Sequence, residues 1–222
     1  MSRRLDAATL RKMAAALDPE DRDEMAIPSY LHRNPALRWM AWRRVVVVAE
    51  LLREQCPKGG TVLDYGCGTG VLFEDALHRA DRVIGVDLVL AAARMLTKQR
   101  GLDRVELLEP DAARLEIAEN TADVIVAAEV LEHIDDLPEV SDFFARTLKP
   151  MGQLLVSLPT ENRAYRLGRR LAGFTGDYHE HDAASIDRLL KGRGWRPVER
   201  RHIPLPGPAC IYLVASYRPP LG

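Results

Sequence analysis

Three closely spaced glycines follow one predicted strand and open a predicted helix. They are Gly66, Gly68 and Gly70 in the run VLDYGCGTG, residues 62–70. Because glycine has no Cβ, such a loop can turn sharply and let the backbone approach a ligand closely. In doubly wound sheets, nucleotides bind at this carboxyl edge of the first strand. The run therefore predicts a nucleotide-type cofactor site, although its spacing is not the GxGxxG of a dinucleotide fold.

An aspartate ends the next predicted strand. Asp87 stands seventeen residues after Gly70, where a carboxylate can accept hydrogen bonds from both hydroxyls of a ribose. Each charge-assisted bond of this kind contributes roughly 1.5–3 kcal/mol. A cluster of turn glycines and a solvated strand-end aspartate would explain these residues without a ligand. Because both features occur together and in the right order, we prefer the cofactor site.

Two glutamates and a histidine follow the fourth predicted strand, in the run AAEVLEHID. If this segment turns helically, Glu129, Glu132 and His133 stand at i, i+3 and i+4 and face one pocket. Imidazole has an ordinary pKa near 6.5 and can be neutral at cellular pH, so His133 is the candidate general base. Glu129 is the second candidate catalytic residue, because it would shape the site beside His133.

The same side chains are also metal-ligand types. Glu129, Glu132 and His133, together with His179 or His181 from the run DYHEHD, could hold Mg²⁺ or another divalent metal. Such an ion would lower the pKa of a substrate hydroxyl. In the metal-free alternative, Glu129 and His133 shape the site and Glu132 forms a local salt bridge. Both interpretations stay open, and the metal-free one is preferred.

Alternating strands and helices must position these residues. Predicted strands at residues 61–65, 82–87, 104–108, 122–128 and 153–158 alternate with predicted helices at residues 71–79, 88–100 and 137–148. This alternation is typical of β–α–β units and of a mostly parallel sheet with helices on both faces. Residues 149–152 read as a turn. Two closing strands, joined by the run PLPGP, suit an antiparallel pair. The predicted fold class is α/β, with a Rossmann-like doubly wound sheet.

Helices are predicted before the sheet. One covers residues 5–17, and the acidic residues 18–25 after it read as a loop. A second begins with Asn34 as N-cap and Pro35 at the first helical position. Trp39 and Trp42 form a second apolar stripe on it, so this helix must bury both stripes or offer one to a ligand.

Residues 1–58 are therefore predicted to be an N-terminal helical cap on a domain formed by residues 59–222, with a lid insertion at about residues 160–181. In the insertion, arginines interleave with apolar side chains, as in a helix that rests on anionic lipid. The alternative is a lid that packs its apolar side chains on the domain. We expect Trp39 and Trp42, beside Arg38, Arg43 and Arg44, to meet the insertion above the pocket.

Composition limits the functional classes. The chain has 222 residues, 47% of them apolar and 28% charged, which is ordinary for one globular domain. Neither a membrane span nor a secretory signal is seen, so we expect a cytoplasmic protein, with peripheral contact with an anionic membrane as an extension. Three dispersed cysteines predict reduced thiols. With 31 basic and 32 acidic residues, nucleic acid is not an expected partner.

Residues 61–217 resemble the class I S-adenosylmethionine-dependent methyltransferases. The resemblance rests on the glycine run, on Asp87 and on the alternating elements. It implies a sheet of seven strands with the last one antiparallel, and S-adenosyl-L-methionine as cofactor. It assigns cofactor contacts to Asp64, Gly66, Cys67, Gly68 and Gly70 for the methionine part, to Asp87 for the ribose, to Leu88, Asp111 and Ala112 for the adenine, and to Glu129 beside the methyl donor.

The EVLEH run resembles a motif of ubiquinone-pathway O-methyltransferases and of small-RNA 2′-O-methyltransferases, in which these residues are associated with a divalent metal. The resemblance implies methyl transfer to an oxygen of a hydrophobic or aromatic small molecule. One alternative is metal-assisted 2′-O-methylation of RNA, which the near-neutral charge disfavours. The other is a scaffold domain that binds the cofactor without catalysis. Nothing in the sequence indicates the oligomeric state.

Overall fold

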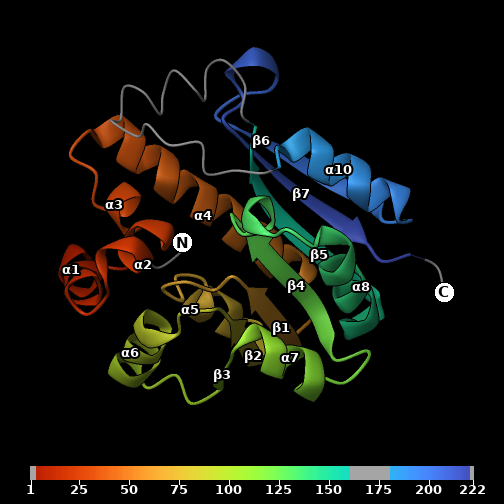
Figure 1. Ribbon diagram of the computed structural model, residues 1–222, viewed down its shortest axis with the longest axis horizontal. Helices are drawn as coiled ribbons and strands as arrows, with labels where there is room; N and C mark the ends of the chain where they lie inside the picture. The colour runs from red at the N-terminus through yellow and green to blue at the C-terminus, as the bar shows by residue number, and fades with distance from the viewer. Residues whose placement is uncertain (1–3, 161–180, 221–222) are drawn as a thin grey trace.

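The computed structural model describes residues 4–160 and 181–220 and shows a seven-stranded sheet between layers of helices (Figure 1). The strands are β1 (Gly60–Tyr65), β2 (Ala80–Val86), β3 (Val105–Leu108), β4 (Ala122–Ala128), β5 (Leu148–Pro159), β6 (Arg196–Ile203) and β7 (Tyr212–Arg218). Their order is β3-β2-β1-β4-β5-β7-β6, and β7 runs antiparallel to both of its neighbours. The predicted doubly wound α/β sheet with an antiparallel last strand is confirmed.

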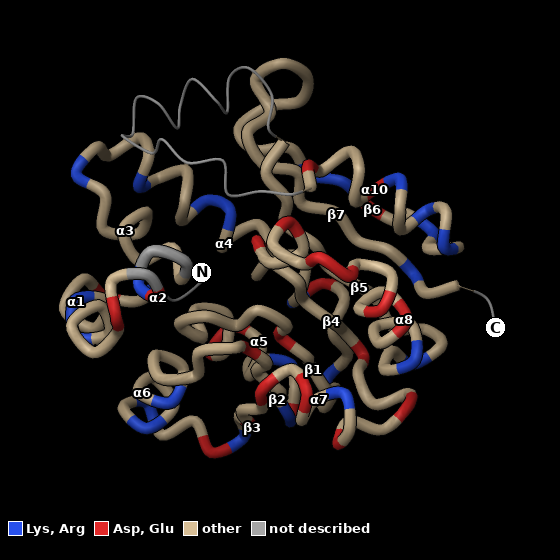
Figure 2. The backbone as a smooth tube through the Cα atoms, in the orientation of Figure 1, with Lys and Arg blue, Asp and Glu red and all other residues tan. Residues whose placement is uncertain are grey.

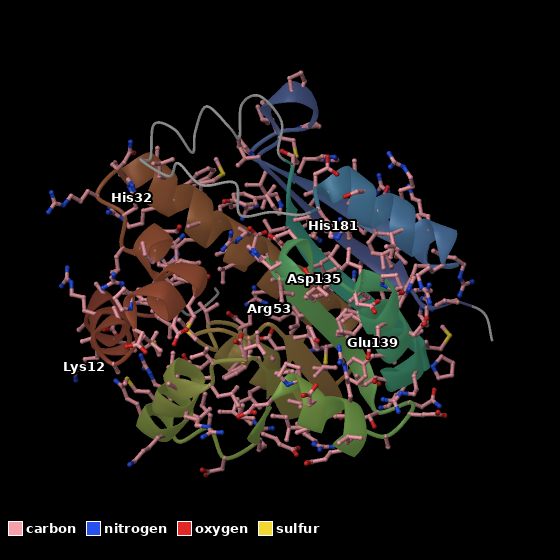
Figure 3. All side chains as sticks on the ribbon, in the orientation of Figure 1. Lys12, His32, Arg53, Asp135, Glu139 and His181 are labelled. Atoms are coloured by element: carbon pink, nitrogen blue, oxygen red, sulfur yellow. The ribbon has the colours of Figure 1, made fainter. Side chains whose placement is uncertain are left out.

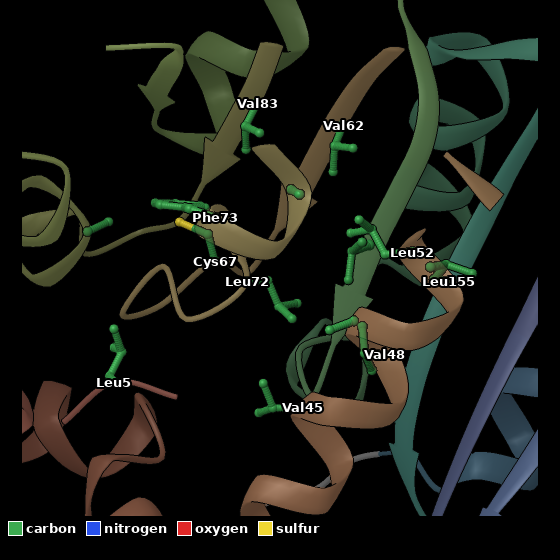
Figure 4. Packing of buried hydrophobic residues seen from close by; sticks show 14 of the residues in the cluster. Leu5, Val45, Val48, Leu52, Val62, Cys67, Leu72, Phe73, Val83 and Leu155 are labelled. Atoms are coloured by element: carbon green, nitrogen blue, oxygen red, sulfur yellow. The ribbon is translucent and has the colours of Figure 1, made fainter. Parts of the chain in front are cut away.

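Helices cover both faces of the sheet because successive strand residues point to opposite sides. Val62, on β1, packs with α5 (Phe73–Leu77) and α6 (Ala91–Arg100) in one buried hydrophobic cluster. Figure 4 shows this cluster. Leu63, the next residue, packs in a second cluster with α7 (Pro110–Glu116), α8 (Leu137–Thr147) and α10 (Ala183–Gly192). The strands therefore read as continuous apolar runs, as expected of a sheet covered on both sides.

Four helices precede the sheet: α1 (Ala7–Ala15), α2 (Pro19–Glu24), α3 (Ile27–Tyr30) and α4 (Pro35–Gln55). Asn34 caps α4 as predicted, with its side-chain oxygen accepting from the Ala36 backbone N–H at 2.9 Å. The predicted loop at residues 18–25 is wrong, because most of it forms α2. This helix is short and polar, so it carries no hydrophobic periodicity by which to predict it.

The helix α4 shares its core with the sheet. Val48 and Leu52 are buried in the same cluster as Val62 and Leu155, across the predicted boundary at residue 58. The division into residues 1–58 and 59–222 stays a prediction. The predicted turn at residues 149–152 is wrong, because β5 already begins at Leu148, and its pairing with β4 is irregular there.

Most of the predicted lid insertion, residues 161–180, lies outside the described residues. In the part of the chain that is described, no helix combines the length and the apolar character needed to cross a membrane.

Candidate active site

The glycine loop joins β1 to α5 at the carboxyl edge of the sheet. Gly66, Gly68 and Gly70 have φ angles of 78°, 49° and 73°, in the left-handed region that favours glycine. The backbone N–H groups of Gly66 and Cys67 both donate to the carbonyl of Val86, at 2.8 and 3.0 Å. The predicted sharp turn is confirmed, and it is tied to the end of β2.

Two side chains sit directly against this loop. A Cβ added to Gly66 would lie 2.5 Å from the Cβ of Val130, and one added to Gly70 would collide with the ring of Phe73. Gly85 on β2 is equally close to Phe73, at 2.8 Å from its ring to an added Cβ. The loop is therefore packed from two directions, by Val130 after β4 and by Phe73 below.

Asp87 follows β2 and faces the glycine loop. Its carboxylate accepts from the backbone N–H of Gly68 at 2.7 Å and from that of Val89 at 3.1 Å. Burial raises its pKa above the ordinary value, against the opposing effect of these two N–H groups. A carboxylate has about four acceptor positions, so Asp87 is oriented and still has capacity for two ligand hydroxyls.

Two further groups lie beneath the loop. Asp64 on β1 is 4% exposed, and burial together with the charge of Asp87 raises its pKa to about 7. Burial raises the pKa of the Cys67 thiol well above its usual range, and the nearby Asp64 and Asp87 add to this shift. Cys67 is thus a protonated thiol, which argues against thiolate chemistry there.

The predicted adenine contacts follow β2 and β3 at the same edge. Leu88 is 80% exposed, an unusual state for a large apolar side chain. Asp111 stands in the first turn of α7, exposed and 3.8 Å from Arg114, with half-buried Ala112 beside it. The structure brings these residues to the sheet edge that carries Asp87. Their roles in cofactor binding stay predictions.

Glu129 directly follows β4 and is bound on both carboxylate oxygens. Arg44 Nη1 donates to one oxygen at 2.7 Å, and Ser157 Oγ donates to the other at 2.9 Å. Burial alone would lower the pKa of Arg44, but the Glu129 carboxylate raises it above its ordinary value, so Arg44 stays charged. The guanidinium also lies 5.0 Å from the centre of the Tyr212 ring.

Glu129, Glu132 and His133 do not face one pocket, so the predicted helical arrangement is wrong. Glu129 has a φ of 57°, and residues Leu131–His133 form a 3-10 turn, η1, in which the His133 N–H donates to the Val130 carbonyl at 3.1 Å. This turn has three residues per turn instead of 3.6, which changes the directions of the side chains. Glu132 is buried, and His133 is exposed.

The predicted metal site receives no support from the described residues. Among them, no three His, Cys, Asp or Glu side chains come together in a way that could hold an ion. His181 is half-buried just before α10, which contacts η1, and Figure 3 labels it with Asp135. His179 lies outside the described residues. The donor set therefore does not fit a metal here, and no step below uses one.

The surface expected on α4 is also smaller than predicted. Trp42 is 5% exposed and stacks on Tyr30 with ring centres 4.7 Å apart, and Arg44 is buried against Glu129. Only Trp39, at 47% exposed, remains a large apolar side chain on that surface. The site role of Arg44 is absent from the sequence prediction. Its place between Ala41 and Val48, at helical spacing within the apolar stripe, was the available signal.

Comparison with known proteins agrees with this geometry. Residues 31–200 match the family model of a methyltransferase domain. A ubiquinone biosynthesis O-methyltransferase of Acinetobacter baumannii is 28% identical over 186 residues, covering 72% of this chain and 78% of that protein. Phosphoethanolamine N-methyltransferase 1 of Triticum aestivum is 32% identical over 151 residues, 63% of this chain and 29% of that protein.

A solved structure shares the fold. It is the N-methyltransferase NodS from Bradyrhizobium japonicum in complex with S-adenosylhomocysteine, with a TM-score of 0.65 and 21% identity over 96% of this chain and 99% of NodS. The family model covers most of the chain, and the bent glycine loop and the oriented Asp87 are what the cofactor of that family requires. The chain belongs to the class I S-adenosylmethionine-dependent methyltransferases.

Proposed function

We propose that this methyltransferase acts on an oxygen of a hydrophobic or aromatic small molecule. The observation that carries the proposal is the position of His133. It is an exposed imidazole on the turn whose Val130 packs against the glycine loop. A hydroxyl acceptor must lose a proton as the methyl group arrives, and a neutral imidazole at this place can take it.

The chain's own residues act mainly by positioning. When bound, S-adenosylmethionine supplies an electrophilic methyl group on its sulfonium. The glycine loop and Asp87 hold and orient the two ends of the binding crevice, and His133 accepts the acceptor proton. Because such a transfer needs no covalent step on the protein, most of the acceleration comes from alignment of acceptor and donor. The carboxylate of Glu129 is bound to Arg44 and Ser157, so we assign Glu129 to shaping the site.

The relatives support two acceptor classes. The Acinetobacter relative is named for O-methylation in ubiquinone biosynthesis, which favours a hydroxylated aromatic acceptor. The Triticum relative is named for an N-methylation, which makes an amine the second candidate. Figure 2 shows basic residues on α4 and α10 and acidic residues near η1 and α8 between them, so no continuous basic surface favours RNA among the described residues.

A membrane contact is proposed only for the α4 surface. Trp39 stands there between Arg38 and Arg43, and an aromatic side chain beside arginines suits the interface of an anionic membrane. Such a contact would give a hydrophobic acceptor a route to the site.

Methyl transfer from labelled S-adenosylmethionine should be measured with two acceptor panels, hydroxylated aromatics with apolar tails and primary amines. We expect transfer to the hydroxylated panel and a loss of kcat of about 10²-fold in His133→Asn, with unchanged binding of S-adenosylhomocysteine. His78→Asn is the matched control, because His78 is also exposed but precedes β2 at the opposite edge of the sheet. Transfer to amines alone would contradict the proposal.

A further inference from the structure

A buried ion pair joins the first long helix to the reaction edge of the sheet. Arg44 on α4 is 7% exposed, and its Nη1 lies 2.7 Å from Oε2 of Glu129, a residue 85 positions later in the chain. Ser157 at the end of β5 donates to the other carboxylate oxygen at 2.9 Å. The Glu129 side chain is therefore held from both sides.

The backbone of Glu129 needs such support. Its φ of 57° lies in the left-handed region, which residues with a Cβ rarely adopt. Its N–H donates to the Ser157 carbonyl at 2.9 Å, so main chain and side chain are both fixed to β5. A conformation of this kind persists only where the surrounding contacts maintain it.

The next residue transmits this conformation to the cofactor loop. Val130 lies so close to Gly66 that an added Cβ there would be 2.5 Å from the Val130 Cβ. A continuous set of contacts thus runs from Arg44 through Glu129 and Val130 to Gly66. If Glu129 left its turn, Val130 would leave the loop.

We propose that Arg44 is a positioning residue for cofactor binding: it holds Glu129 in its left-handed turn and so keeps Val130 against the glycine loop at Gly66. The role concerns the cofactor, so it does not depend on whether the acceptor is an oxygen or a nitrogen. It also explains why a cation on α4 is buried at the edge of β4.

Stability alone is a weak explanation for this pair. Removing two charges from water costs about as much as their attraction returns, so buried ion pairs add little net stability. The Tyr212 ring, 5.0 Å from the guanidinium carbon, covers another side of Arg44 and limits where it can point. Such restraint serves position more than stability.

Binding of S-adenosylhomocysteine to the full chain, measured by calorimetry, tests the proposal. We expect Arg44→Met to weaken binding about tenfold or more, and Arg44→Lys to recover part of the loss by restoring a cation. Arg43→Met is the matched control, since Arg43 is the adjacent residue on α4 and pairs with Glu50 at 3.4 Å on the surface. Its binding should stay within about twofold of the unmodified protein.

A double-mutant cycle separates positioning from general damage. In a Val130→Ala background the contact with Gly66 is already weakened, so Arg44→Met should cost much less binding than in the unmodified chain. If Arg44→Met does not fold, Glu129→Gln, which keeps a hydrogen-bonding side chain but removes its charge, takes its place in the cycle. Binding in folded Arg44→Met within about twofold of the unmodified chain would overturn the proposal. So would an equal loss with and without Val130.

Discussion

Replacing Asp64 by asparagine should make the cofactor-free protein more stable at neutral and alkaline pH. Asp64 is buried on β1 at 4% exposed, and burial together with the charge of Asp87 raises its pKa from 3.8 to about 7. The folded protein therefore holds a proton that the unfolded chain has already released. Asparagine has nearly the same shape and cannot ionise, so it removes the cost of a buried charge.

The size of the effect follows from proton linkage. Each tenfold difference in proton affinity corresponds to about 1.36 kcal/mol. A carboxyl group whose pKa rises from 3.8 to about 7 thus costs the folded state about 4 kcal/mol once it is ionised. Because the raised pKa belongs to the folded state, the stability of the unmodified protein falls as pH rises from about 4 to about 7 and then levels off.

Urea unfolding of the cofactor-free protein at several pH values between 5 and 8 measures this directly. The gain from Asp64→Asn should be largest at pH 8, up to about 4 kcal/mol, and should shrink toward pH 5. Asp187→Asn is a control of opposite sign. Although partial burial opposes it, hydrogen bonds from Lys191 and Tyr217 lower the pKa of Asp187, so its loss should destabilise the protein more at pH 8 than at low pH.

The same substitution should weaken cofactor binding. The ionised Asp64 carboxylate is the expected partner for the positive methionine end of the cofactor, so Asp64→Asn should bind S-adenosylhomocysteine more weakly at pH 8. Binding to the unmodified protein near pH 7 should release protons as Asp64 ionises. If Asp64→Asn is no more stable than the unmodified protein at pH 8, the reasoning about this buried charge is refuted.

Other substitutions test neighbouring features. Gly66→Ala should reduce S-adenosylhomocysteine binding by about tenfold or more, because its φ of 78° and the nearby Val130 both exclude a Cβ. Gly101→Ala is its control, with a φ of 59° but no atom near an added Cβ, and calorimetry should show unchanged binding. Asp87→Ala should abolish measurable binding by removing the acceptor for the ribose, and binding near the unmodified level would exclude that role. Flotation with anionic vesicles should weaken with added salt and in Trp39→Ala, whereas no flotation of the unmodified protein would remove the membrane proposal.

The sheet and the glycine loop could be predicted because their signals are local. Buried parallel strands are uninterrupted apolar runs, and Gly101 ends α6 in the left-handed conformation that a helix-ending glycine adopts, with a φ of 59°. The helix α2 was missed because six polar residues without an apolar stripe carry no such signal.

The arrangement around Glu129 could not be predicted, because it depends on residues far apart in the chain. Arg44 and Glu129 are separated by 85 positions, and nothing in the spacing of either residue points to the other. Helical spacing suggested a shared face for Glu129 and His133. The left-handed backbone at Glu129 prevents it, and glutamate is not a residue type that signals such a conformation.

The reversed direction of β7 has a consequence for how such an enzyme can diversify. Pro159 at the end of β5 pairs with Tyr212 at the start of β7, so the connection from β6 to β7 opens at the same edge as Asp87. Insertions or exchanges in this connection would alter one wall of the crevice and leave β1 and β2, which carry the cofactor half, unchanged. Grafting residues 204–211 between related enzymes is therefore a route to new acceptors with an old cofactor site.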